Sequence, residues 1–116
     1  MQRESRNVTT VVANGGAVSA VIDATWASAQ GIKTPAALEA TTKIGFQVSE
    51  SAEGTFLPLY DELNALIEVT VTLNAARGYA VPEKVKAWPY FKLWCENAGS
   101  DVNQTADRTF TIVQKS

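Results

Sequence analysis

The sequence contains no histidine and only one cysteine among its 116 residues. Histidine is the commonest general base and the commonest transition-metal ligand, so its absence removes the side chain most often found at catalytic and metal sites. A zinc ion would be left with carboxylates and one thiolate, which is a poor ligand set. The single Cys95 excludes a disulfide within the chain, and its apolar surroundings predict a small buried side chain. Because no histidine or basic pair flanks Cys95, we expect its thiol to be unreactive.

Long hydrophobic runs and a strong excess of one charge are missing as well. No apolar stretch approaches the roughly 18 residues of a membrane-spanning helix, and the N-terminal segment MQRESRNVTT lacks the apolar centre of a secretory signal. The net charge of -2 gives no electrostatic attraction to nucleic acid or to an anionic membrane. We therefore expect neither nucleic acid nor a membrane as a partner.

Known catalytic motifs are also lacking. GxSxG, the P-loop, GxGxxG, HExxH and CxxC do not occur. Five acidic residues and no Lys or Arg lie between Lys43 and Arg77, but their spacing matches no calcium loop and predicts a solvated acidic edge. Asp61 and Glu62 are adjacent on an extended segment and so point apart. We expect a protein that is not an enzyme and that has no cofactor or metal.

What the sequence does contain is alternation of apolar and polar residues. Hydrophobic residues make up 46% of the chain, enough for the core of one domain. The clearest pattern spans residues 42–73, with alternation over 44–48 and 67–73 and an apolar, aromatic run at 55–60 between them. A period of two places the apolar side chains on one face of a strand. We expect three short strands here, arranged as a meander with one buried face and one solvated face.

Similar short segments follow one another along the rest of the chain. A polar loop is predicted at 97–107, and single helical turns at 35–39 and 83–87. The other expected strands cover residues 8–12, 18–22, 32–34, 79–81, 90–96 and 108–114. Seven or eight short strands separated by turns predict an all-β fold, an antiparallel, jelly-roll-like β-sandwich formed by residues 13–116.

Residues 1–12 leave two alternatives open. The polar beginning is typical of an extended arm that becomes ordered only against a neighbouring subunit. The β-prone run at 8–12 would equally suit the first strand of the sandwich. If the segment is an arm, Arg3, Arg6 and Val8 are expected to contact a partner.

The aromatic residues near position 90 suggest a second contact surface. In the strand expected at 90–96, Phe91, Leu93 and Cys95 share one face, and Tyr90, Lys92 and Trp94 share the other. Since both faces carry large apolar groups, we expect Tyr90 and Trp94, together with Trp88, to pack against another subunit. The alternative is that a loop or the N-terminal segment covers Trp94. Trp26 is expected to fill the core at the edge of the sandwich, and the alternative is an exposed contact.

Two long segments resemble structural proteins of tailed bacteriophages. In IGFQVSESAEGTFLPLYDELNALIEVTV, an FQxS strand is followed by a turn ending in glycine and by an aromatic strand that leads into LYD. In WPYFKLWCENAGSDVNQTADRTFTIV, an aromatic-x-Lys-Leu strand is followed by a polar loop and a closing ADRT. The motifs cover roughly residues 15–114, and the chain departs from the family pattern at 64–65 and 94–96.

The resemblance implies a small virion protein with a jelly-roll-like sandwich. Such proteins are most often capsid decoration, or cement, proteins that are assembled in the host cytoplasm. They stabilise the head through contacts with the major capsid protein and with their own copies, usually as homotrimers. Two alternatives remain: a tail or neck component, and a glycan- or receptor-binding module of a head fibre or tail. The second follows from a local similarity of the FQxS hairpin to discoidin-type sandwiches, and its expected contacts to a host surface glycan are Trp26, Trp88, Asp61 and Asn64.

Overall fold

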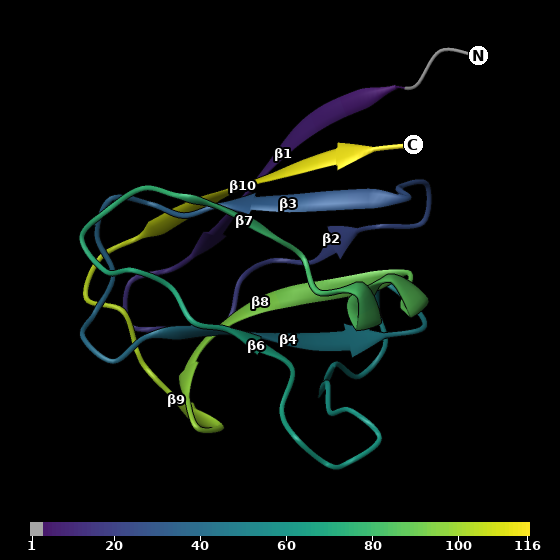
Figure 1. Cartoon of the computed structure of the whole chain (residues 1–116). Coiled ribbons are helices and arrows are strands. Elements are labelled where there is room, and N and C mark those ends of the chain that lie inside the picture. The colour runs from purple at the N-terminus through teal and green to yellow at the C-terminus, as the bar shows by residue number, and fades with distance from the viewer. Residues whose placement is uncertain (1–3) are drawn as a thin grey trace.

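Two antiparallel sheets pack face to face in the computed structural model, which describes residues 4–116 (Figure 1). The four-stranded sheet has the order β1 (Ser5–Val12), β10 (Arg108–Lys115), β3 (Ala29–Lys33) and β7 (Gly78–Ala80). The six-stranded sheet has the order β2 (Ile22–Asp23), β8 (Tyr90–Asn97), β4 (Lys43–Ser49) and β5 (Leu57–Pro58), with β6 (Glu68–Val69) on β4 and β9 (Ser100–Asp101) on β8. The predicted all-β, antiparallel sandwich is confirmed. The chain passes repeatedly from one sheet to the other, which is compatible with a jelly roll.

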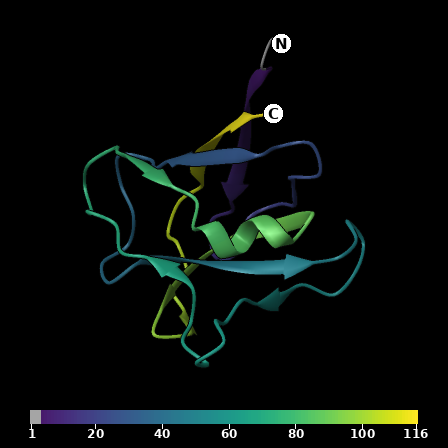
Figure 2. The same cartoon turned by 45° about the vertical axis from the view of Figure 1, so that its right-hand side comes forward.

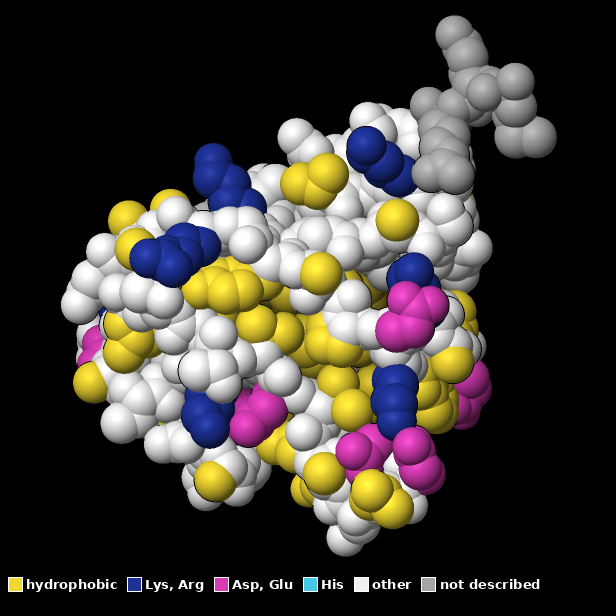
Figure 3. All heavy atoms as spheres, viewed as in Figure 1, with side chains coloured by type: hydrophobic (Ala, Val, Ile, Leu, Met, Phe, Trp, Pro, Cys, Tyr) yellow, Lys and Arg dark blue, Asp and Glu magenta, His cyan; other side chains and the backbone are white. Residues whose placement is uncertain are grey.

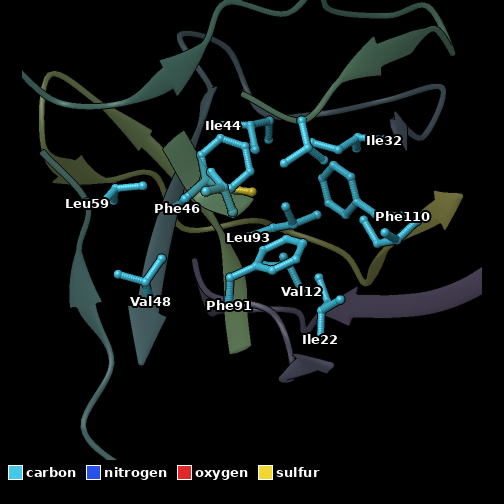
Figure 4. Close-up of a cluster of buried hydrophobic side chains, with 14 of the residues drawn as sticks. Val12, Ile22, Ile32, Ile44, Phe46, Val48, Leu59, Phe91, Leu93 and Phe110 are labelled. Atoms are coloured by element: carbon cyan, nitrogen blue, oxygen red, sulfur yellow. The ribbon is translucent and has the colours of Figure 1, made fainter. Parts of the chain in front are cut away.

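The core lies between the inner faces of the sheets. Phe46 of β4 and Phe91 of β8 meet there with ring centroids 6.1 Å apart (Figure 4). Ile32 and Phe110 reach them from the four-stranded sheet. Cys95 belongs to this cluster, and burial raises the pKa of its thiol to about 12. The thiol is therefore protonated at neutral pH, as expected for an unreactive core residue.

One of the two predicted helical turns is present. The 3-10 helix η1 (Glu83–Ala87) lies between the sheets at one side of the sandwich, where the fully buried Val85 closes the core (Figure 2). The turn predicted at 35–39 is wrong, because that segment is not helical. Its Leu38 is buried in the core, and the backbone N–H of Glu39 donates to the side-chain oxygen of Gln104 (3.1 Å).

The predicted three-strand meander is also wrong. β4 already pairs with β8 along one edge, and both β5 and β6 pair with its other edge. Residues 60–66 loop out between β5 and β6. A bridge between Tyr60 and Leu66 and a hydrogen bond from the N–H of Ile67 to the carbonyl of Leu59 (3.0 Å) close this loop at its base. β5 and β6 thus form one interrupted edge strand.

For residues 5–12, the first-strand alternative is the one observed. They form β1, which pairs with β10 from Ser5 to Val12, so an unpaired arm over this range is wrong. The inward side chains of Thr10 and Val12 are both buried and help to hold β1 on the sandwich. Arg3 lies outside the described residues. The N-terminal end of β1 projects beyond the body of the sandwich, beside the C-terminus (Figure 1).

Candidate functional site

The four-stranded sheet has an open edge at β1. On its inner side β1 pairs with β10, and the N–H of Ser116 donates to the carbonyl of Glu4 (3.0 Å). In an antiparallel pair, residues alternate between those that bond to the partner strand and those that face away. Because Glu4 is hydrogen-bonded to Ser116, the backbone groups of the even-numbered residues of β1 point towards β10. The backbone groups of the odd-numbered residues point outward.

Only one end of this outward edge is covered. Val12 bridges Ser19, and the Thr10 hydroxyl donates to the carbonyl of Ala20 (3.2 Å). Within residues 4–116, no backbone pairing is found for the outward groups of Ser5, Asn7 and Thr9. The segment from Ser5 to Thr9 is roughly 17 Å long at the usual rise per residue of a strand. The free edge, defined as residues 5–9, can therefore accept one short strand.

The side chains leave the free edge accessible. Exposed edges are commonly protected by lysine, proline or a bulge, whereas β1 contains no proline and pairs with β10 without interruption. Arg6 is the one charged residue of β1, and its guanidinium lies over the Trp26 ring, 4.3 Å from the ring centroid. The Arg6 Nε also donates to the side-chain oxygen of Gln114 (3.2 Å). These contacts hold Arg6 against the chain's own surface and not across the edge.

A polar network anchors this end of the molecule. The fully buried Gln114 accepts hydrogen bonds from Arg6 and from Trp26 Nε1 (3.2 Å), and it donates to the Gln30 side chain (2.8 Å) and to the Asp23 carbonyl (2.9 Å). Trp26 is half-buried and outside the hydrophobic core, so its predicted core position is wrong. Beside it lies an open cavity of about 270 Å³, which is lined by Glu4, Ser5, Arg6 and Trp26.

The predicted interface residues around position 90 do not form a common exposed surface. Trp94 is only 4% exposed, lies against Gly45, and donates from Nε1 to Asp101 of β9 (2.8 Å). The chain's own strands therefore bury nearly all of the Trp94 side chain, which leaves little of it to pack against another subunit. Trp88 is half-buried and packs on the core. Tyr90 is half-buried, as is Val8 on β1.

The predicted glycan contacts lie in different parts of the fold. Asp61 and Asn64 belong to the loop between β5 and β6, on the six-stranded sheet. Asp61 Oδ1 accepts the backbone N–H groups of Ala65 (2.9 Å) and Leu63 (2.8 Å), which lower the pKa of the Asp61 carboxyl. Trp26 lies in the connection between β2 and β3, which bonds to β10 of the other sheet. The structure thus separates Trp26 from Asp61 and Asn64, which belong to connections on different sheets.

Charged side chains of both signs lie on the face shown in Figure 3. Lys and Arg side chains occur in its upper and lower parts, and the Asp and Glu side chains lie in its middle and lower parts, several of them beside a Lys or Arg. Across residues 4–116, no three acidic or cysteine side chains are grouped so as to hold a metal ion. Within the same range, no helix has the length and apolar character needed to cross a membrane.

A scan against protein-family models, a search of curated proteins and a search of solved structures each found no match. Function must therefore be inferred from the chain's own geometry and from the sequence resemblance.

Proposed function

We propose that this protein is a non-enzymatic structural protein that assembles with other protein subunits by strand addition at the free edge of β1. The observation that supports the proposal is the row of outward backbone groups at Ser5, Asn7 and Thr9, which have no pairing in the described chain. Such groups otherwise bond to water, and another extended chain can pair with the whole row at once. Strand addition also needs no deep pocket and no charged side chain at the contact.

More narrowly, we propose that the protein is a capsid decoration protein of a tailed bacteriophage, which binds to the major capsid protein and to its own copies in the virion. The resemblance of residues 15–114 to that family supports this form. A strand of about five residues gives a small contact, and many small contacts repeated over a shell add up to a large stabilisation. A cement protein works in this way.

The two edges of the four-stranded sheet give two modes of self-assembly. Pairing of β1 with a second β1 is a two-fold contact and ends at a dimer. Pairing of β1 with the β7 edge of the next copy is head-to-tail, and it can close into the homotrimer expected from the resemblance. The mass of the assembly in solution distinguishes these modes.

Asn7→Pro tests the free edge directly. The Asn7 N–H faces outward, so proline removes an edge donor and leaves every bond to β10 in place. Asn7→Ala is the matched control, since alanine keeps that N–H. We expect light scattering over a range of concentrations to show an oligomer for the wild type and Asn7→Ala, and a monomer with an unchanged melting temperature for Asn7→Pro.

Mass spectrometry of virus particles purified from cells that carry the gene tests the narrower form. The chain is expected in the particles, and Asn7→Pro is expected to reduce its amount. A wild-type protein that is monomeric at every concentration and missing from the particles would overturn the proposal.

Sugar binding beside Trp26 is a second candidate function. The observation in its favour is the open cavity where a half-buried indole meets Glu4, Ser5 and Arg6, a mixture of aromatic and polar groups common at glycan sites. Asp61 and Asn64 would take no part. A glycan array, followed by fluorescence titration of any hit against the wild type and Trp26→Phe, tests this candidate, and an array without hits removes it.

A further inference from the structure

Two carboxyl groups meet on the outer face of the six-stranded sheet. Glu96 of β8 is 0% exposed, and the side chain of Glu68 of β6 is 23% exposed. Both are neighbours of β4, because Glu96 pairs with Lys43 and Glu68 pairs with Gly45. β4 therefore separates the two glutamates in the sheet, and their side chains have to cross it to meet.

Gly45 provides the space for this crossing. A Cβ atom at position 45 would lie 3.0 Å from Glu96 Cγ and 3.3 Å from Glu96 Oε2, so the Glu96 side chain lies over this glycine. Glu68 is the partner of Gly45 on the other edge of β4. With no side chain at position 45 to keep them apart, the carboxyl groups of Glu68 and Glu96 lie on the same side of β4, where Glu68 helps to raise the pKa of Glu96.

Neighbouring N–H groups satisfy only some of the carboxyl oxygens of Glu68 and Glu96. The N–H of Gly99 donates to Glu96 Oε1 (3.4 Å), and Lys43 Nζ lies 3.5 Å from Glu68 Oε1. The Oε2 atoms of both glutamates are buried and have no partner among the described residues. Two ionised carboxylates are acceptors only and cannot bond to each other. A single proton held by one of them supplies the missing donor.

Charged side chains on neighbouring strands surround the Glu68–Glu96 pair. Lys43 on β4 is the nearby cation, while Asp101 on β9 is paired opposite Glu96 and accepts a hydrogen bond from Trp94. Burial and the hydrogen bond with Glu68 raise the pKa of Glu96 to about 7, and the Gly99 N–H and the charge of Lys43 oppose this rise only in part. A carboxyl in such a place keeps its proton well above the usual range.

We propose that Glu68 and Glu96 share one proton and form a pH-dependent clasp that holds β6 on β4. Loss of the proton leaves two like charges in contact, with Lys43 available to neutralise one of them. β6 has two residues and lies on the sheet edge, so it is the element that separates most easily. Its release would also free the loop at 60–66. The clasp lies on the opposite sheet from the free edge of β1 and acts independently of it.

A divalent cation is a poorer occupant than a proton. The site has two carboxylates, whereas calcium takes about six to eight oxygen ligands. The Lys43 ammonium already lies beside Glu68, where it would repel a metal. Calcium is nevertheless added in one of the experiments below, because it would stabilise a cation site and would not replace a shared proton.

Amide hydrogen exchange of β6 tests the clasp. Protection factors, corrected for intrinsic exchange, are measured for residues 66–70 and for β10 between about pH 4.5 and pH 8. We expect protection at β6 to fall by up to about tenfold per pH unit as the pH rises towards the Glu96 pKa of about 7, and to level off above it. Over the same range, β10 reports how far the stability of the whole sandwich changes. In Glu96→Gln, the amide donates to Glu68 in place of the proton, so protection is expected to stay level. Glu68→Gln gives the same test at a partly exposed position if Glu96→Gln does not fold.

Glu62→Gln is the matched control. Glu62 is an exposed glutamate in the loop before β6 and pairs with Lys84, so its replacement should leave the pH dependence of β6 unchanged. Constant protection of wild-type β6 from about pH 4.5 to pH 8 would overturn the proposal, as would a pH-dependent fall that persists in both glutamine variants. Calcium that restores protection of wild-type β6 at about pH 8 would overturn it in favour of a cation site.

Discussion

Glu96→Gln is expected to change how the stability of the whole sandwich depends on pH. Burial and the hydrogen bond with Glu68 raise the pKa of Glu96 from the ordinary value of 4.5 to about 7. The folded chain thus binds this proton more tightly than the unfolded chain does. The resulting stabilisation is complete below about pH 4.5, declines as the pH rises towards 7, and is lost above that pH.

The size of the effect follows from the same pKa. A rise from 4.5 to about 7 corresponds to about 3 kcal/mol in the free energy of unfolding, at about 1.4 kcal/mol per unit of pKa. Glu96 is 0% exposed, so bulk water does little to screen the interaction. Small domains have a total stability of roughly 5–15 kcal/mol, which makes a change of this size readily measurable. A glutamine at position 96 can donate a hydrogen bond to Glu68 and has no titrating proton to lose.

Urea unfolding, followed by tryptophan fluorescence at several pH values from about 4.5 to 8, is the assay. Carboxyls whose pKa is lowered, such as Asp23 and Asp61, lose stability as the pH falls and so act in the opposite direction. Their contributions are the same in both proteins, so they cancel when the free energy of unfolding of the wild type is subtracted from that of Glu96→Gln. We expect the variant to gain up to about 3 kcal/mol relative to the wild type across this range. A difference that stays constant with pH would refute the reasoning.

Two further predictions concern the same face of the sheet. Gly45→Ala places a methyl group 2.9 Å from Trp94 Cε3 and 3.0 Å from Glu96 Cγ, and thermal unfolding should show a loss of about 1–3 kcal/mol; Gly78→Ala, where nothing lies within 4 Å, is the control with little change. Trp94→Ala should lower the free energy of unfolding by about 3–5 kcal/mol, because the side chain is buried. Unchanged stability with a smaller assembly mass would instead place Trp94 at a subunit interface.

Much of the fold could be predicted from the sequence because strand periodicity is a local property. The alternation at 44–48 and around Phe110 identified β4 and β10 and the faces that they bury. The pairing of strands is not local. The residues of β5 and β6 have the same pattern whether these strands form a meander or share one edge of β4. Their arrangement depends on β8, which is distant in sequence and occupies the other edge of β4.

The candidate site could be predicted in part. The polar and β-prone character of the N-terminal segment pointed to a contact region, but its pairing with β10 depends on a strand about a hundred residues away in sequence. For Trp94, the pattern showed correctly that both faces of β8 are apolar. It could not show that Gly45 and β9 cover that side chain. The Glu68–Glu96 pair was missed because a glutamate on the outer face of a strand is usually solvated, and the one local signal was the glycine at 45.

The loop at 60–66 is held together by its own contacts, so its tip can change without disturbing the sheet. Its base is closed by the Tyr60–Leu66 bridge, and Asp61 shapes its interior. Leu63 near its tip is 83% exposed. A foreign peptide inserted after Leu63 would therefore be displayed outside the sandwich while β5 and β6 stay on β4. If the protein coats a particle, each copy would carry one such insert, and the coat would become a regular array for presenting epitopes or enzymes.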